Sequence, residues 1–150
     1  MRKAVLASVV FAAAASAVAA SAVAAEYASV AAPGAILYDG PSPSAHKAFV
    51  APAGMPIELL SVIRLWVKVR DASGDVTWIE RSSISPARTV VTVADAFVRT
   101  APREQAPVVL LVAHGVMLEL VEGASPAGWA RVRHRDGTTG YARAVDLWGL

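Results

Sequence analysis

The sequence of 150 residues contains no cysteine. This absence excludes a disulfide framework, a thiol nucleophile, thiolate zinc sites and a lipid-modified N-terminal cysteine. An excess of one charge is also absent after the first 25 residues: without Arg2 and Lys3, 12 basic residues face 12 acidic ones. Binding of nucleic acid or of an anionic membrane surface needs a concentrated basic face, so we expect neither as a partner.

The N-terminus has the pattern of a secretory signal. The cationic residues Arg2 and Lys3 precede an uncharged, mostly apolar run at residues 4–20, and residues 22–25 offer small side chains of the A-x-A type. A permanent transmembrane helix is the alternative, but it needs about 20 strongly apolar residues. We therefore predict a signal helix over 1–25, cleaved near Ala25, a periplasmic or secreted protein, and no stable membrane insertion.

The rest of the chain contains two copies of one unit. Residues 35–60 align with residues 96–121 at a constant offset of 61, which becomes 63 after a two-residue insertion. The matched positions carry alanine, proline, glycine, glutamate and aromatic residues: Ala35 and Ala96, Pro41 and Pro102, Gly54 and Gly115, Glu58 and Glu119, Trp66 and Trp129, Gly74 and Gly137, Trp78 and Tyr141. Such consistent spacing indicates a duplication.

Each unit is predicted to consist of short strands. In the second unit, β-branched or alternating segments lie at residues 90–93, 96–99, 108–112, 117–121 and 129–133. Asp136 and Gly137 tolerate the positive φ angles of a tight hairpin turn, and Ser73 and Gly74 take that turn in the first unit. About five strands in roughly 60 residues, without a long helical period, predict an all-β fold of two tandem small barrels.

The same residues resemble the bacterial SH3-like domain family. The resemblance rests on LYDGP (37–41), WVKVR (66–70), GWARVR (128–133), Asp136-Gly137 and Gly140-Tyr141. It covers about residues 27–150, whose ending AVDLWGL is similar to that of exported tandem SH3 proteins. Leu65 and Thr77 stand where glycine is usual in the family, which predicts an altered hairpin in the first unit. The resemblance implies two SH3-like barrels that act as binding or targeting modules of the cell envelope.

The predicted domains are 26–85 and 90–150, joined by a linker at 86–89. A domain of about 60 residues buries only about 60% of its unfolded surface and is marginally stable alone. The linker is short and contains Pro86, so the two barrels must lie close together. We therefore expect them to share an apolar interface.

Aromatic and basic residues at matched positions are the candidate ligand-binding residues: Tyr38, Trp66, Trp78, Trp129, Tyr141, Arg131 and Arg133. By the period-2 pattern, Trp66 and Trp129 share the outward strand faces with Lys or Arg, where they would form a stacking platform for a sugar or peptide. The alternative, favoured by their recurrence in a duplicated scaffold, is that they cover the barrel ends or the interface between the units. Arg99 replaces Tyr38 in the second copy, so two identical grooves are not expected.

The remaining polar residues do not suggest catalysis. His46, His114 and His134 have no ligand spacing and are interpreted as solvated. Glu58 and Glu119 are interpreted as outward strand residues, and the basic run at 131–135 as a solvated hairpin, with an anionic partner as the alternative. We therefore expect no enzyme, no metal and no cofactor. The sequence predicts a module that binds peptidoglycan or an envelope protein; the alternative is an adaptor that acts through protein contacts.

Overall fold

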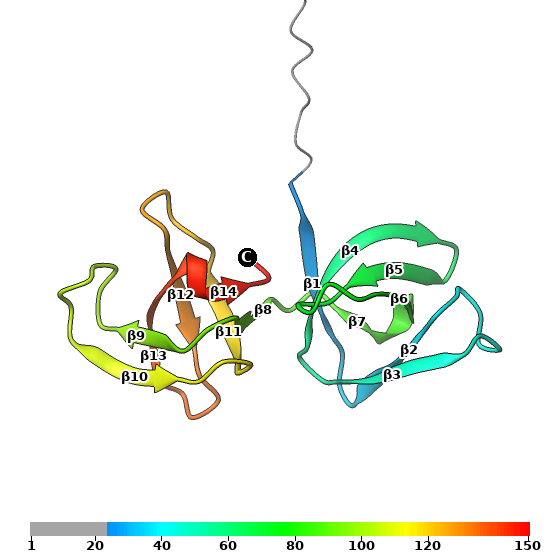
Figure 1. Cartoon of the computed structure of the whole chain (residues 1–150), viewed down its shortest axis with the longest axis horizontal. Helices are drawn as coiled ribbons and strands as arrows, with labels where there is room; N and C mark the ends of the chain where they lie inside the picture. The colour runs from blue at the N-terminus through cyan, green and yellow to red at the C-terminus, as the bar shows by residue number, and fades with distance from the viewer. Residues whose placement is uncertain (1–23) are drawn as a thin grey trace, which may run out of the picture.

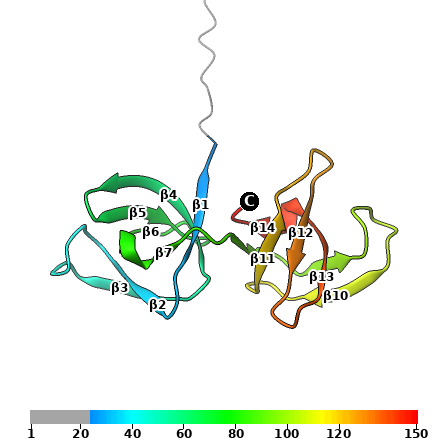
Figure 2. The same ribbon diagram turned by 180° about the vertical axis from the view of Figure 1, so that it is seen from behind.

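The computed structural model describes residues 24–150, which form two small β-barrels side by side (Figures 1 and 2). Each barrel is one antiparallel seven-stranded sheet. The first contains β1 (Glu26–Val30), β2 (Gly34–Tyr38), β3 (Lys47–Pro52), β4 (Pro56–Ile63), β5 (Trp66–Arg70), β6 (Val76–Glu80) and β7 (Ile84–Ser85). The second contains β8 (Thr89–Thr92), β9 (Ala96–Arg99), β10 (Val108–Val112), β11 (Met117–Glu122), β12 (Trp129–Arg133), β13 (Thr139–Arg143) and β14 (Leu147–Trp148). The predicted all-β fold of two tandem barrels is confirmed.

The duplication extends to the strand order. The first sheet has the order β3-β2-β6-β5-β4-β1-β7, and the second repeats it as β10-β9-β13-β12-β11-β8-β14. Single-turn 3₁₀ helices precede the last strand of each sheet, η1 (Arg81–Ser83) and η2 (Ala144–Asp146). Each barrel has seven strands, more than the five or so expected, and one of the additional strands is the two-residue β7 or β14. A segment of two residues is too short to show a period-2 pattern.

The predicted signal helix falls almost entirely on residues 1–23, which lie outside the described residues. Within residues 24–150, no helix has the length and apolar character needed to cross a bilayer.

Each barrel has its own apolar core, built by the alternation of the strands. In β5, Val67 and Val69 point inward and are 2% and 0% exposed, whereas Trp66, Lys68 and Arg70 lie on the outer face. The two cores are centred on large, fully buried side chains such as Ile57 and Leu118. Burying one such side chain contributes about 1.5–3 kcal/mol, so the inward residues hold the fold and leave the outer face free to vary.

The hairpin after β4 differs between the barrels. In the first barrel β4 runs to Ile63, which pairs with Trp66, so the turn is only Arg64 and Leu65. Arg64 has a positive φ of 56°, a conformation that glycine adopts more readily. In the second barrel β11 ends at Glu122, and residues 123–128 form a longer loop. The sequence predicted an altered hairpin here, because Leu65 stands where the second barrel has glycine.

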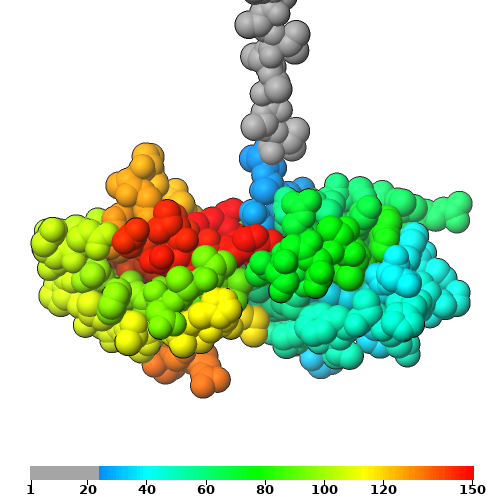
Figure 3. Space-filling view, in the orientation of Figure 1, coloured from blue at the N-terminus to red at the C-terminus, as the bar shows by residue number. Residues whose placement is uncertain are grey.

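The contact between the barrels combines aromatic packing with hydrogen bonds. The ring of Tyr27 meets that of Trp148 edge-on, with centroids 5.2 Å apart. The Thr89 hydroxyl donates to the Gly54 carbonyl at 2.7 Å and lies 2.7 Å from the Ser29 hydroxyl. The space-filling view shows the last residues of the chain pressed against the first barrel (Figure 3). The expected interface was apolar; in the structure it is polar in part, because linker residues hydrogen-bond to both barrels.

Candidate ligand-binding grooves

Two grooves lie at matched places on the outer faces of the two barrels. Groove 1, of about 510 Å³, lies over β2, β3 and β6 and is lined mainly by Pro33, Ile36, Tyr38, Val50, Pro52 and Glu80. Groove 2, of about 230 Å³, lies over β9 and β13 and is lined by Asp95, Phe97, Arg99, Glu104, Arg143 and Asp146. The repeat offsets pair Ile36 with Phe97, Tyr38 with Arg99 and Glu80 with Arg143. The same scaffold position therefore has different chemistry in the two barrels.

Groove 1 is apolar and aromatic, with one carboxylate. Tyr38 packs edge-on against Trp66, with ring centroids 5.2 Å apart, so one predicted aromatic supports another. Val50 is 72% exposed and pairs across the strands with Ile36. Among residues 24–150, no basic side chain lies within ion-pair distance of Glu80. The groove can therefore hold an apolar or aromatic group beside a hydrogen-bond donor or a cation.

Groove 2 is occupied by its own ion pairs. The Glu104 carboxylate lies 3.8 Å from the guanidinium of Arg99 and 3.6 Å from that of Arg143. Arg99 also donates a hydrogen bond to the Ala106 carbonyl at 2.9 Å, and its guanidinium lies 5.5 Å from the Phe97 ring centroid. These contacts fill the place that the Tyr38 ring occupies in the first barrel. The prediction that the two units lack identical grooves agrees with this geometry.

The other predicted aromatics lie outside the two grooves. Trp78 is half-buried on the outer face of β6, with the Lys68 ammonium 5.8 Å from its ring centroid. Trp129 is only 8% exposed, which leaves little area for a ligand, and Tyr141 is half-buried. The structure brings Tyr38 and Trp66 together but does not place any of these side chains between the barrels. That position belongs to Tyr27 and Trp148.

The predicted arginines of β12 are paired with carboxylates. Arg131 reaches Glu122 at 3.1 Å, and Arg133 donates to both oxygens of Glu119 at 3.0 Å. The first barrel has the same arrangement, since Arg70 donates to Glu58 at 2.9 Å. Cross-strand pairs on an exposed face contribute modestly to stability. The main role of these arginines is therefore to stabilise the sheet through cross-strand ion pairs.

The hairpin between β12 and β13 is held by local hydrogen bonds. The Thr138 backbone N–H donates to Asp136 at 2.8 Å, and this bond, with further bonds from the Thr138 side chain and His134, lowers the Asp136 pKa to about 2. His134 was expected to be solvated, but its side chain is only 19% exposed and lies 3.1 Å from Asp136. His46 and His114 are exposed. Among residues 24–150, no three His, Asp or Glu side chains gather as a metal site would require.

Tyr27 is a site residue that sequence reasoning missed. Burial raises the pKa of its hydroxyl, and the Glu58 carboxylate raises it further, while Arg70 and Arg88 act in the opposite direction. The Arg88 guanidinium lies 5.7 Å from the Tyr27 ring centroid and donates to the Gly149 carbonyl at 2.8 Å. Tyr27 lies in β1 before the aligned blocks begin, so the repeat did not single it out. Glu80 was missed as well, since it is matched with a residue of opposite charge.

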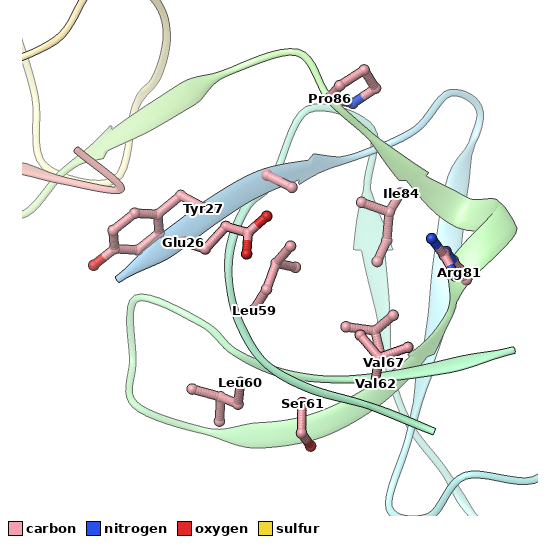
Figure 4. Close-up of a pocket in the computed structure, with 11 residues that line it drawn as sticks. Glu26, Tyr27, Leu59, Leu60, Ser61, Val62, Val67, Arg81, Ile84 and Pro86 are labelled. Carbon is pink, nitrogen blue, oxygen red and sulfur yellow. The ribbon is translucent and has the colours of Figure 1, made fainter. Parts of the chain in front are cut away.

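A further hollow lies at one end of the first barrel, between β1, β4 and β7 (Figure 4). Its volume is about 670 Å³. Leu59, Val62, Val67 and Ile84 lie around it, while the Tyr27 ring points away from it (Figure 4). The hollow offers apolar contact, with Glu26 and Arg81 as its charged lining residues.

The sequence has known relatives at the level of a domain family. The model described as "Bacterial SH3 domain" matches twice, over residues 31–86 and 92–149. No curated protein matches the chain. Two solved structures from Trichomonas vaginalis are similar over most of it: NlpC2, with 15% identity over 83% of this chain and a TM-score of 0.39, and NlpC1, with 16% identity over 86% and a TM-score of 0.40. The alignments cover 48% and 47% of those chains, so this chain spans about half their length.

Proposed function

This chain belongs to the bacterial SH3 domain family, and from that premise we propose that it is an exported, non-catalytic binding module of the cell envelope. Its ligand is peptidoglycan or an envelope protein, held in groove 1. Two bacterial SH3 domains account for nearly all of residues 31–149. The proposed place of action, periplasm or medium, rests on the signal-like pattern of residues 1–25.

The observation that carries this proposal is the difference between the matched grooves. Groove 1 is lined by Ile36 and the exposed Val50 around a carboxylate without a counter-ion, and Tyr38, which is buried and packs against Trp66, forms part of its wall. In groove 2 the corresponding charges are paired with one another. A ligand at groove 2 must break ion pairs before it binds, whereas one at groove 1 displaces only water. The first barrel is therefore the binding barrel in this proposal.

Sedimentation with purified peptidoglycan tests the proposal. We expect the protein without residues 1–25 to sediment with the wall material, and V50E to reduce the retained fraction at least tenfold. L111E is the matched control, because Leu111 is 62% exposed at the corresponding place of the second barrel and lies outside groove 2. Retention no greater than that of an unrelated protein would exclude peptidoglycan as the ligand. Equal loss in both variants would exclude groove 1 as the site.

An adaptor role is the second candidate, and the hairpin between β4 and β5 favours it. Leu60, Val62, Ile63 and Leu65 are 37%, 57%, 50% and 74% exposed there. A cluster of exposed apolar side chains often marks a protein contact. The corresponding loop of the second barrel, residues 123–128, contains only Gly, Ala, Ser and Pro. A photo-crosslinker at Leu65 that captures one envelope protein, in cells where V50E leaves wall retention unchanged, would favour the adaptor role.

A further inference from the structure

The hollow at the end of the first barrel exists because two strands part there. β1 pairs with β4 only as far as Glu26 and Leu59. Beyond that point β4 continues to Ile63 with a register shift between Leu59 and Ser61, paired with β5 alone. Figure 4 shows β4 curving away from β1 around the apolar side chains. The hollow therefore reaches down to the edge of the core, where the buried Val67 is one of its lining residues.

The second core has an additional leucine packed against it. Leu150 packs against the second core together with Leu120, which the repeat matches with Leu59. At the offset of 63, the residue matched with Leu150 is Ala87, which is exposed and leads into the second barrel. No leucine from residues 24–150 therefore covers the first core as Leu150 covers the second. The hollow of about 670 Å³ is large enough to admit a leucine side chain together with its backbone.

The charged residues beside the hollow indicate which charge a ligand would carry next to its apolar side chain. Arg81 lines one side, and its counterpart in the second barrel is Ala144. In residues 24–150, no carboxylate lies within ion-pair distance of Arg81. Glu26 lies at the other side, next to Tyr27, and would repel a second carboxylate (Figure 4). The Arg81 guanidinium can therefore pair with the one negative charge of such a ligand.

We propose that this hollow is a second binding site, which holds the carboxyl-terminal end of a peptide that ends in a leucine-like residue. The apolar side chain enters between Leu59, Val62 and Ile84, and the terminal carboxylate pairs with Arg81. The site lies apart from groove 1 and shares no lining residue with it. Its success or failure is therefore independent of wall binding through groove 1.

N-acetyl-L-leucine and its amide are the probes, because they differ only in the charge. We expect the acid to shift the methyl NMR signals of Leu59, Val62 and Ile84 with a Kd on the order of 1 mM, as suits so small a ligand. The amide should bind at least fivefold more weakly. Signals that do not move, or equal binding of acid and amide, would overturn the proposal.

Two matched pairs of variants locate the site. R81Q should lower the affinity for the acid to that for the amide, whereas R103Q, an exposed arginine of the second barrel, should leave it unchanged. V62D should abolish binding, whereas V145D, at a residue that is 68% exposed, should not. All four positions are exposed, so the variants should fold, which the dispersion of their NMR spectra checks. Equal effects of R81Q and R103Q would show nonspecific attraction and contradict the site.

Discussion

The two barrels have the same strand order and very different outer surfaces. Both keep an apolar core, a glycine turn after β5 or β12, and a cross-strand ion pair, Glu58 with Arg70 or Glu119 with Arg133. Outside, Tyr38 is replaced by Arg99, and an open apolar groove by an ion-pair cluster. The comparison teaches that inward residues are constrained by packing, whereas outward residues of a duplicated fold can acquire separate roles.

Placing a residue of one barrel at the matched position of the other should produce the largest change in the free energy of unfolding. A Cβ at Gly140 would lie 2.6 Å from the Arg99 carbonyl oxygen and 2.7 Å from Cγ1 of Val98. G140T, which copies Thr77 of the first barrel, should therefore lower the free energy of unfolding by about 2–4 kcal/mol. The reverse change, T77G, should cost about 1 kcal/mol or less. Urea unfolding measures both, and equal losses would contradict the difference in strand approach.

Removing the aromatic contact between the barrels should have a smaller effect. W148A deletes the edge-on partner of Tyr27, so the barrels should couple less strongly during unfolding. A double-mutant cycle of W148A with Y27A isolates this contact, and we expect a coupling of about 0.5–1.5 kcal/mol. Differential scanning calorimetry of the two single variants and the double variant provides the values. A coupling of zero would mean that the two rings touch without holding the barrels together.

Neutralising the matched ion pairs should give the smallest change in the free energy of unfolding. The Glu58 side chain is 15% exposed and that of Glu119 is 54% exposed, so solvent weakens the second pair more. We expect E58Q to cost about 1 kcal/mol and E119Q less than about 0.5 kcal/mol. E58Q should also lower the pKa of the Tyr27 hydroxyl, because the Glu58 charge raises it. An ultraviolet titration follows that pKa, and an unchanged midpoint would contradict the assignment.

The fold could be predicted from the sequence because its signals repeat. Two blocks with matched Trp, Gly and Pro, together with alternation such as that of residues 129–133, indicate tandem barrels. Leu65, one of the two departures in the first unit, marks the hairpin that differs in the structure. The two-residue strands β7 and β14 carry too few residues for any pattern.

The site could be predicted only in part. The repeat pointed to aromatic positions, and of these Tyr38 lines groove 1 and contacts Trp66. The repeat could not predict that Trp129 is buried. The period-2 alternation shows which face of the strand a residue lies on, but not which neighbouring residues cover that face. Glu80 and Arg81 were not found either, since their counterparts Arg143 and Ala144 differ in charge. The hollow depends on where β1 leaves β4, which is a property of strand pairing rather than of residue type.

The hydroxyl of Thr89 has a consequence for how the two barrels are held relative to each other. Through it, the first residue of β8 in the second barrel is bonded to Ser29 and Gly54 of the first barrel. A flexible tether would let two binding faces search for targets at many separations, and its length would set their effective concentration. Here the Thr89 hydroxyl joins β8 to β1 and to the turn before β4, so side-chain hydrogen bonds connect the barrels in addition to the backbone. A ligand held by the first barrel is therefore presented with the second barrel beside it.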